Sequence, residues 1–536
     1  MKKWNGSQFY QHFLCIMLIL LILPLTVGFT QVIFIDFIDY ARFSFSGTWM
    51  KWILVILLLI TLIVLIKILR RIFWSKRRFW IVFLLMNLVI LIMRVCWLRL
   101  FPINSYYDMN EVLQAAFAIT NGDYQTFSHN GYLFMAPTNI PITFILTWVI
   151  GVMKQLAIPA EWTSLARCMQ LINLVMMQGI TLILSGCVYW LSDRDHAKTI
   201  LALIVIALFF PYLSYTFYVY NDIPSVVFYS MMLLFFILYE KQKKAVWIIL
   251  TAVCLTIGNL IRPIGTIYLL AFLFYFLTVR FSKKHLLLCF VFLLLFQIPT
   301  RWMDQALMKE GYTTFSITTT QDIELSRQLN GICKGFSYGT DGQTPGFFSL
   351  PCDQIWQRNH GDYTEASRQY RQMIQEEWQQ FENPWEWLQF LVTKYLYQWG
   401  DGSFETVTFN DIGPQANQIT SFMPQYSSKR QWVQRTMIGD WIIQYNQAFW
   451  MIMLLTFLHS TRKNQEEILS FFYLCILGFM AFYLIWEVSP HYLFPLIPIM
   501  LVLFIHELES FFQRLQKGLI CFLGWIRRKM GHHPDV

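Results

Sequence analysis

Residues 67–111 read KILRRIFWSKRRFWIVFLLMNLVILIMRVCWLRLFPINSYYDMNE, and this stretch decides the fold. Its first part carries six positive charges and no acidic residue: Lys67, Arg70, Arg71, Lys76, Arg77 and Arg78. The apolar run Phe79–Leu100 follows, and at about 1.5 Å per residue it crosses a hydrocarbon core of about 30 Å. Because clusters of Lys and Arg stay on the cytoplasmic side, this run leads outward. Asp108 and Glu111 are therefore predicted at the outer membrane surface.

The rest of the chain repeats this pattern of apolar runs and short basic loops. Of its 536 residues, 56% are hydrophobic and 14% are charged, whereas soluble domains carry about 25% charged residues. The composition predicts an all-α polytopic membrane protein embedded in a lipid bilayer. The net charge of +9 is explained by topology-setting loops and a basic tail. We expect no nucleic-acid partner.

About 12 transmembrane helices are predicted when the basic N-terminus is placed inside. They cover residues 13–35, 49–66, 79–100, 165–190, 200–217, 224–239, 245–261, 263–279, 285–299, 446–458, 469–486 and 491–505. With this threading every cluster of Lys faces the cytoplasm. The protein is accordingly expected in the plasma membrane as a multi-pass protein.

One further apolar stretch, residues 140–157, is predicted not to cross the membrane. If it crossed, Lys241, Lys243 and Lys244 would lie outside, against the charge bias. Pro137 and Pro141 at its start also disfavour a straight helical insertion. The stretch is therefore expected to lie along the outer interface or to re-enter.

The threading divides the chain into four parts. Residues 1–78 form two extra N-terminal transmembrane helices, and 79–300 form a transmembrane core with the first outer loop. Residues 301–445 are polar and form an extracellular α-rich domain, and 446–536 form the C-terminal transmembrane helices and a basic cytoplasmic tail. Cys333 and Cys352 fall in the outer part, where a disulfide between them is permitted but not required.

Asp108 and Glu111 are the first candidates for chemistry. Three residues apart on a helix, they share one face. A carboxylate beside a bilayer can act as a general base or as a ligand for a cation, which leaves a divalent cation open as a cofactor. The same spacing fits a helix capping box. The two roles are compatible.

Two other outward turns carry candidate residues. Asp222 lies in Tyr220-Asn221-Asp222-Ile223-Pro224, which also suits a helix start. Glu487 and His491 lie four apart in the turn 486–492, where turn chemistry and aromatic anchoring are the alternative. The threading places all three on the same outer face as Asp108.

Arg262 and Arg94 are basic groups in apolar surroundings. A charge inside a membrane is costly and is usually paired or functional. The guanidinium suits phosphate because it donates two hydrogen bonds in a fork. For Arg262 the alternative is an interfacial anchor. For Arg94 it is a salt bridge to a membrane carboxylate, or a side chain that reaches to the interface.

These motifs together resemble a known superfamily. In order they are Asp108 after an outward span, Pro-Thr-Asn-Ile-Pro (137–141), Tyr-Asn-Asp (220–222), Asn-Leu-Ile-Arg-Pro (259–263) and Trp-Glu-x-x-x-His-Tyr (486–492). They resemble the GT-C superfamily of polyprenyl-phosphate-sugar glycosyltransferases. The likeness is greatest to a branch in Gram-positive bacteria, related to protein O-mannosyltransferases and lipid A aminoarabinose transferases. It covers roughly residues 79–505.

The resemblance implies a GT-C-like helical bundle and an inverting sugar transfer from a lipid phosphate, usually undecaprenyl phosphate in bacteria. Asp108 is then the expected catalytic residue, in an active site that faces outside. Helices at 110–120 and 140–157 are expected to roof the cavity. Relatives commonly carry Arg before the Tyr of the late turn, where this chain has His491. A phosphate contact there is expected to be weaker and dependent on pH.

Three functions compete at this point. The first is a membrane glycosyltransferase that modifies a cell-wall polymer, a glycolipid or an exported protein, with Asp108 as catalytic residue. The residues that would support catalysis or bind donor and acceptor are Glu111, Asp222, Arg262, Arg94, Glu487 and His491. The second is a transporter or flippase for a lipid-linked sugar, although no inverted repeat is evident. The third is a non-catalytic subunit for envelope assembly.

Overall fold

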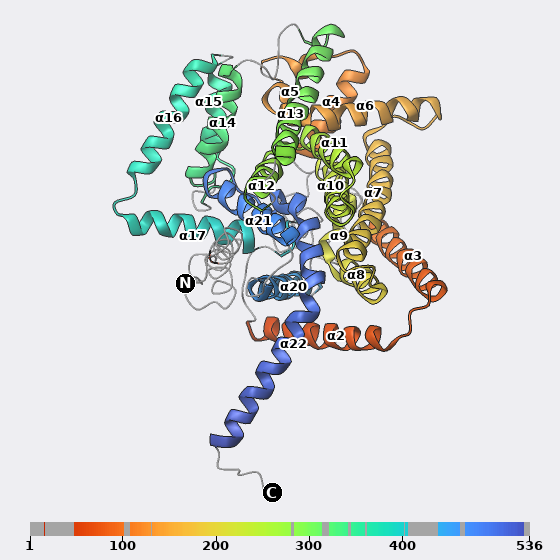
Figure 1. Ribbon diagram of the computed structural model, residues 1–536. Coiled ribbons are helices and arrows are strands. Elements are labelled where there is room, and N and C mark those ends of the chain that lie inside the picture. Colours follow the sequence, from red (N-terminus) through yellow and green to blue (C-terminus); the bar gives the residue numbers. More distant parts are fainter. Residues whose placement is uncertain are drawn as a thin grey trace, which may run out of the picture.

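The computed structural model describes residue 16 and residues 48–100, 108–129, 131–279, 283–313, 321–340, 345–359, 362–400, 402–405, 438–460 and 467–529 (Figure 1). Within these ranges every regular element is helical, apart from one isolated bridge between Tyr338 and Pro345. The prediction of an all-α polytopic membrane protein is confirmed. The predicted span 13–35 lies outside the described residues.

Seven helical segments in the described part of the chain are long and apolar enough to cross a membrane, or up to nine if each bent pair counts as one span. They are in α2 (Thr48–Arg71), α3 (Lys76–Leu100), α7 (Trp162–Leu191), α10 (Asp222–Gln242), α13 (Lys283–Lys309), α21 (Glu467–Ile485) and α22 (Ile497–Lys529) with the residues just before it. Three further predicted spans correspond to the shorter helices α11 (Ala245–Ile261) and α12 (Gly265–Thr278) and to the 23-residue helix α20 (Ile438–Ser460). Most predicted spans therefore correspond to helices.

The predicted span 200–217 is broken rather than straight. It consists of α8 (His196–Leu208), α9 (Phe210–Ser214) and the 3-10 turn η4 (Tyr215–Phe217). The two halves are bent by 69°. Pro211 follows the break, and proline cannot continue the backbone hydrogen bonds of a preceding helix. The bend returns the chain toward the turn that precedes α10.

The centre of the bundle is α10, which packs against α7 and α11 and also contacts α22. Its apolar window is 72% buried, against 28% for α2 and α3, so these two helices are peripheral and present apolar faces outward. Close approach of α10 and α11 depends on Gly258, where an added Cβ would lie 2.8 Å from the Tyr229 ring. The N-terminus of α10 is thereby held beside the C-terminal end of α11.

The first outer loop folds into α4 (Asp108–Thr120), η2 (Gln125–Phe127), α5 (Tyr132–Met135), η3 (Pro137–Asn139) and α6 (Ile140–Gln155). The chain bends by 103° between the segments 125–135 and 137–155, at the prolines that predicted a break. Helix α6 packs on α4 and α7. These helices lie together at one end of the molecule, and α2 lies at the other (Figure 1). The interfacial or re-entrant assignment of residues 140–157 stays a prediction.

The predicted extracellular part contains α14 (Gln321–Phe336), α15 (Leu350–Arg358), α16 (Tyr363–Gln379) and α17 (Pro384–Gly400). Helix α14 packs on α16 and also on α21. An added Cβ on Gly335 would lie 2.0 Å from the carbonyl oxygen of Ile485, so this contact needs glycine. The predicted domain boundary at 300/301 falls inside α13, which continues to Lys309.

Cys333 and Cys352 lie in the small core between α14, α15 and α16. Both side chains are fully buried and both are free thiols. They belong to one buried cluster that also contains Tyr370. The disulfide that the sequence permits is not formed in this structure.

Candidate functional site

Helix ends that are far apart in the sequence meet at the end of the molecule that contains α4. The meeting segments are the start of α4, the turn before α10, the α11–α12 turn and the turn 486–492 between α21 and α22. Each was predicted as an outward turn. We call the polar residues gathered there the outer cluster: Asp108, Asn139, Tyr220, Asn221, Asp222, Arg262, Glu405, Ser489, His491 and Tyr492.

Arg262 and Asp222 form the buried centre of the outer cluster. Arg262 is 8% exposed and Asp222 is 1% exposed. Arg262 Nη1 donates to Asp222 Oδ1 and, at 3.2 Å, to Asn221 Oδ1. The guanidinium also lies over the Tyr492 ring, 5.6 Å from its centroid. Asp222 therefore neutralises the charge of Arg262 in this buried position.

A chain of hydrogen bonds joins this pair to Asp108. Asn221 Nδ2 donates to Asn139 Oδ1 at 2.9 Å, and Asn139 Nδ2 donates to the Tyr220 hydroxyl at 2.9 Å. The Tyr220 hydroxyl donates to Asp108 Oδ2 at 3.1 Å. Buried polar groups of this kind hold one another in a single geometry, because each loses its partner if another moves. Asp108 is therefore positioned by a network that begins at Arg262.

Asp108 and Glu111 occupy the first turn of α4, as their spacing predicted. Both are exposed, whereas Asp222 is buried. Partial burial, and then the charge of Asp108, raise the pKa of Glu111. Two exposed carboxylates on one helical turn can accept a proton at this surface.

His491 is held by a glutamate that the sequence did not single out. Its Nδ1 lies 2.6 Å from Glu405 Oε2, and the Ser489 hydroxyl donates to the same oxygen at 2.7 Å. Glu405 is 3% exposed. Phe404 and Glu405 have φ of 52° and 61°, in the left-handed region that non-glycine residues rarely adopt. Strained backbone of this kind is found at functional positions, where surrounding contacts maintain it.

Glu487 lies beside charged residues of α14 and α15. Its Oε2 lies 3.8 Å from Lys334 Nζ, and Lys334 pairs with Asp353 at 2.7 Å. Burial raises the pKa of Glu487, and the charge of Lys334 opposes this shift. Its backbone N–H donates to Gly331 O at 3.0 Å, which ties the late turn to α14.

Arg94 does not join the outer cluster. It is 1% exposed between α3, α7 and α9. Its guanidinium donates to Gln178 Oε1 at 2.7 Å, Thr181 Oγ1 at 2.8 Å and Tyr212 O at 3.4 Å. Neutral acceptors, rather than a carboxylate, surround it in the described part of the chain. Arg94 therefore joins α3 to α7 and α9.

The described residues contain no group of three His, Cys, Asp or Glu side chains that could hold a metal ion. Asp222 Oδ2 is buried and has no hydrogen-bond partner among them. This oxygen is an open acceptor beside Arg262. It can accept a hydrogen bond from a bound hydroxyl group or water.

The fold and the outer cluster define a polytopic membrane protein with ordered acid, base and guanidinium groups at one end of its helical bundle. A family model described as dolichyl-phosphate-mannose-protein mannosyltransferase matches residues 141–302. This stretch runs from α6 into α13 and contains Asp222 and Arg262. The match confirms the resemblance to GT-C glycosyltransferases and implies a membrane glycosyltransferase. The Gram-positive branch stays a prediction.

No curated protein sequence and no solved structure matches the chain. Several residues of the site lie outside the matched stretch, including Asp108, Glu405, Glu487 and His491. Their roles are therefore inferred from their positions and contacts in the structure. Sequence reasoning missed Glu405, Asn139 and Lys334 as members or neighbours of the site. Asn139 lies in the Pro-Thr-Asn-Ile-Pro motif at 137–141, whereas Glu405 follows a short Gly402-Ser403-Phe404 segment with no periodic pattern.

Proposed function

We propose that this protein transfers a sugar from a polyprenyl-phosphate donor to an acceptor on the outer side of the plasma membrane. The acceptor is a cell-wall polymer, a glycolipid or an exported protein. The observation that carries the proposal is the hydrogen-bonded path from exposed Asp108 to the buried Asp222–Arg262 pair. The family match over residues 141–302 supports the same reaction class.

Asp108 is the proposed catalytic residue. An acceptor hydroxyl attacks the anomeric carbon of the donor, its proton passes to Asp108, and the bond from that carbon to the phosphate oxygen breaks. Polyprenyl phosphate leaves with the bonding electrons. A single displacement of this kind inverts the configuration of the sugar. Tyr220 orients the Asp108 carboxylate, and a base held in one geometry is more effective than a mobile one.

Arg262 is proposed to stabilise the leaving phosphate. Its described hydrogen bonds use Nη1 alone. The remaining edge of a guanidinium presents two donors in the geometry that phosphate oxygens prefer. His491, held by Glu405, is the second candidate for a phosphate contact. Preorganised donors stabilise developing charge without having to reorganise during the reaction.

The reaction is tested with purified full-length protein and a polyprenyl-phosphate sugar. Release of polyprenyl phosphate, together with transfer of label to an envelope extract, is the expected result. The matched control is Asp108→Asn, which preserves the shape of the side chain. A transporter or an assembly subunit would release no polyprenyl phosphate, and that outcome would reject the proposal.

A further inference from the structure

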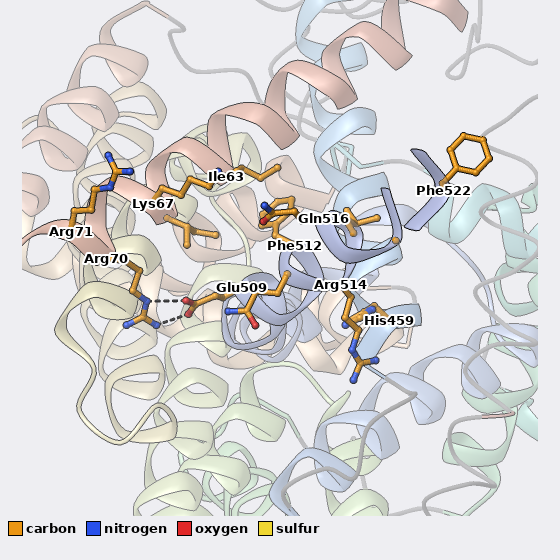
Figure 2. A pocket seen from close by; sticks show the side chains of 14 residues that line it. Ile63, Lys67, Arg70, Arg71, His459, Glu509, Phe512, Arg514, Gln516 and Phe522 are labelled. Atoms are coloured by element: carbon orange, nitrogen blue, oxygen red, sulfur yellow. Dashed lines mark hydrogen bonds and ion pairs between the residues drawn. The ribbon is translucent and has the colours of Figure 1, made fainter. Parts of the chain in front are cut away.

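A cavity of about 1100 Å³ lies between the C-terminal part of α2 and the middle of α22 (Figure 2). It is far from the outer cluster, because α2 and the end of α22 lie at the opposite end of the molecule from α4 (Figure 1). Pockets for small ligands usually measure about 300 to 1,000 Å³. This cavity is therefore large enough for a sizeable ligand.

One side of the cavity is tied by ion pairs. Arg70 donates from Nε and Nη2 to the two carboxylate oxygens of Glu509, at 2.9 and 2.5 Å (Figure 2). Its Nη1 donates to Asp195 at 2.6 Å. Arg70 thus joins α2 to α22 and to the start of α8. A bidentate ion pair therefore fixes the two walls of the cavity to each other.

Three further cations line the same cavity: Lys67, Arg71 and Arg514. All three are exposed, and none forms an ion pair within the part of the chain that the structure describes. Glu509, the acidic residue of the lining, is already engaged by Arg70. The remaining lining charge is therefore positive and complements an anion.

The rest of the lining is largely apolar, and includes Ile63, Ile66, Phe512 and Phe522. Beyond the cavity, α22 continues with exposed apolar side chains, of which Ile520 and Trp525 are 61% and 51% exposed. A helix that combines such residues with Lys and Arg lies at a membrane surface. By the charge bias, this end of the bundle faces the cytoplasm. A ligand there is both anionic and apolar.

We propose that the cavity binds an anionic phospholipid of the cytoplasmic leaflet, such as phosphatidylglycerol. Its phosphate lies beside Lys67 and Arg71, its acyl chains lie along Ile63 and Phe512, and Arg514 adds positive charge on the other side of the cavity (Figure 2). This site is separate from the sugar-transfer site and does not depend on the proposed function. It anchors α2 and α22, which are otherwise joined at this end through Arg70.

The test uses full-length protein in phosphatidylcholine vesicles that contain a minority of photo-crosslinkable phosphatidylglycerol. Crosslinked peptides are expected from α2 and from the middle of α22. The variant Lys67→Gln/Arg71→Gln/Arg514→Gln should reduce this crosslinking about 10-fold, because each cation near an anionic lipid contributes to its binding. The matched control, Lys76→Gln/Arg77→Gln/Lys517→Gln, removes the same charge from residues that do not line the cavity and should retain crosslinking.

Four outcomes overturn the proposal. Equal losses in both triple variants would show general attraction to basic surfaces. Crosslinks spread evenly over lipid-facing helices would show ordinary bilayer contact. Displacement by inorganic phosphate would show an anion site without lipid specificity, and preferential displacement by polyprenyl phosphate would assign the cavity to a different lipid.

Discussion

Asp222 and Arg262 show at the scale of single residues how the outer cluster is held. Each was noticed separately in its own turn, and the structure pairs them in a buried position. A buried charge is tolerated because its partner is present, and removal of one partner leaves an uncompensated charge. Structural and catalytic roles therefore overlap in these residues, and experiments must separate them.

The first prediction concerns Asp108. In Asp108→Asn the amide oxygen still accepts the hydrogen bond from Tyr220, so the fold is expected to stay near the parent. The amide cannot take a proton, and turnover should fall by about 10²-fold or more. Steady-state kinetics with a lipid-linked sugar, alongside thermal unfolding, provides the measurement. Glu111→Gln should be milder. Near-normal turnover of Asp108→Asn would move the catalytic assignment to Asp222.

The second prediction is a double-mutant cycle on the buried pair. Arg262→Gln and Asp222→Asn should each destabilise the protein by about 3 to 5 kcal/mol, because each leaves one buried charge unpaired. The double variant should lose less than the sum of the two, with a coupling of about 0.5 to 3 kcal/mol. The affinity for the donor distinguishes a structural role of Arg262 from a role in binding the donor phosphate. If Arg262 binds the donor phosphate, Arg262→Gln and the double variant should both lose donor affinity, whereas unchanged affinity in both removes Arg262 from the donor site.

At the scale of elements, one lysine joins α14, α17 and the C-terminal end of α21. Lys394 of α17 is fully buried, and its Nζ donates to Gly335 O at 2.5 Å and Leu484 O at 3.1 Å. The backbone N–H of Val488 donates to Gly346 O at 2.8 Å in the same region. The outer helices thus set the position of the turn that carries His491.

The third prediction follows from the protonation of Lys394. Burial lowers its pKa from 10.5 to about 7, although the charge of Glu487 opposes the shift. The unfolded chain therefore binds one more proton than the folded chain between about pH 7 and pH 10.5. Stability should rise with pH across this window, by at most about 1.4 kcal/mol per pH unit. Thermal unfolding at several pH values measures this slope.

The control separates Lys394 from the other titrating groups. Lys394→Met should flatten the slope between about pH 7 and 10.5. Lys309→Met, at an exposed position of α13, should leave the slope as in the parent. A slope that persists in Lys394→Met would mean that another group is responsible.

At the scale of the whole molecule, residues predicted on the same side of the membrane meet one another. Turns assigned outside form the outer cluster, and segments assigned inside form the Arg70–Asp195–Glu509 contacts at the other end. A Lys241–Asp193 pair joins the loop that contains Asp195 to a further loop assigned inside. This separation supports a single orientation in which residues 140–157 do not cross.

The fourth prediction tests that orientation. Single cysteines at exposed positions 123 and 376 should react with an impermeant thiol reagent in intact cells, and a cysteine at position 244 should not. The background must lack Cys15, Cys96 and Cys521. Position 222 is unsuitable, because it is buried. Labelling at both 123 and 244, with loss of labelling at 376, would show that residues 140–157 cross and that the assignment of the later loops is inverted.

The sequence by itself determined the fold class, the approximate spans and which turns share an end of the bundle. These properties depend on local quantities, namely the length of apolar runs, the positions of Lys and Arg, and prolines such as Pro137. The broken helix at Phe209 was missed because a continuous apolar run hides a bend when hydropathy alone is considered.

Only the tertiary structure decided which polar groups meet. Arg94 and Arg262 have similar local sequence environments, yet Arg262 pairs with Asp222 and Arg94 lies among neutral acceptors. Glu405 reaches His491 across 86 residues of chain, through a left-handed turn that no periodic pattern marks. Contacts of this kind depend on how helices pack over long sequence separations, where close approach at Gly258 and Gly335 sets the distances. Hydropathy and charge place residues on one side of a membrane, and packing alone brings them within hydrogen-bonding distance.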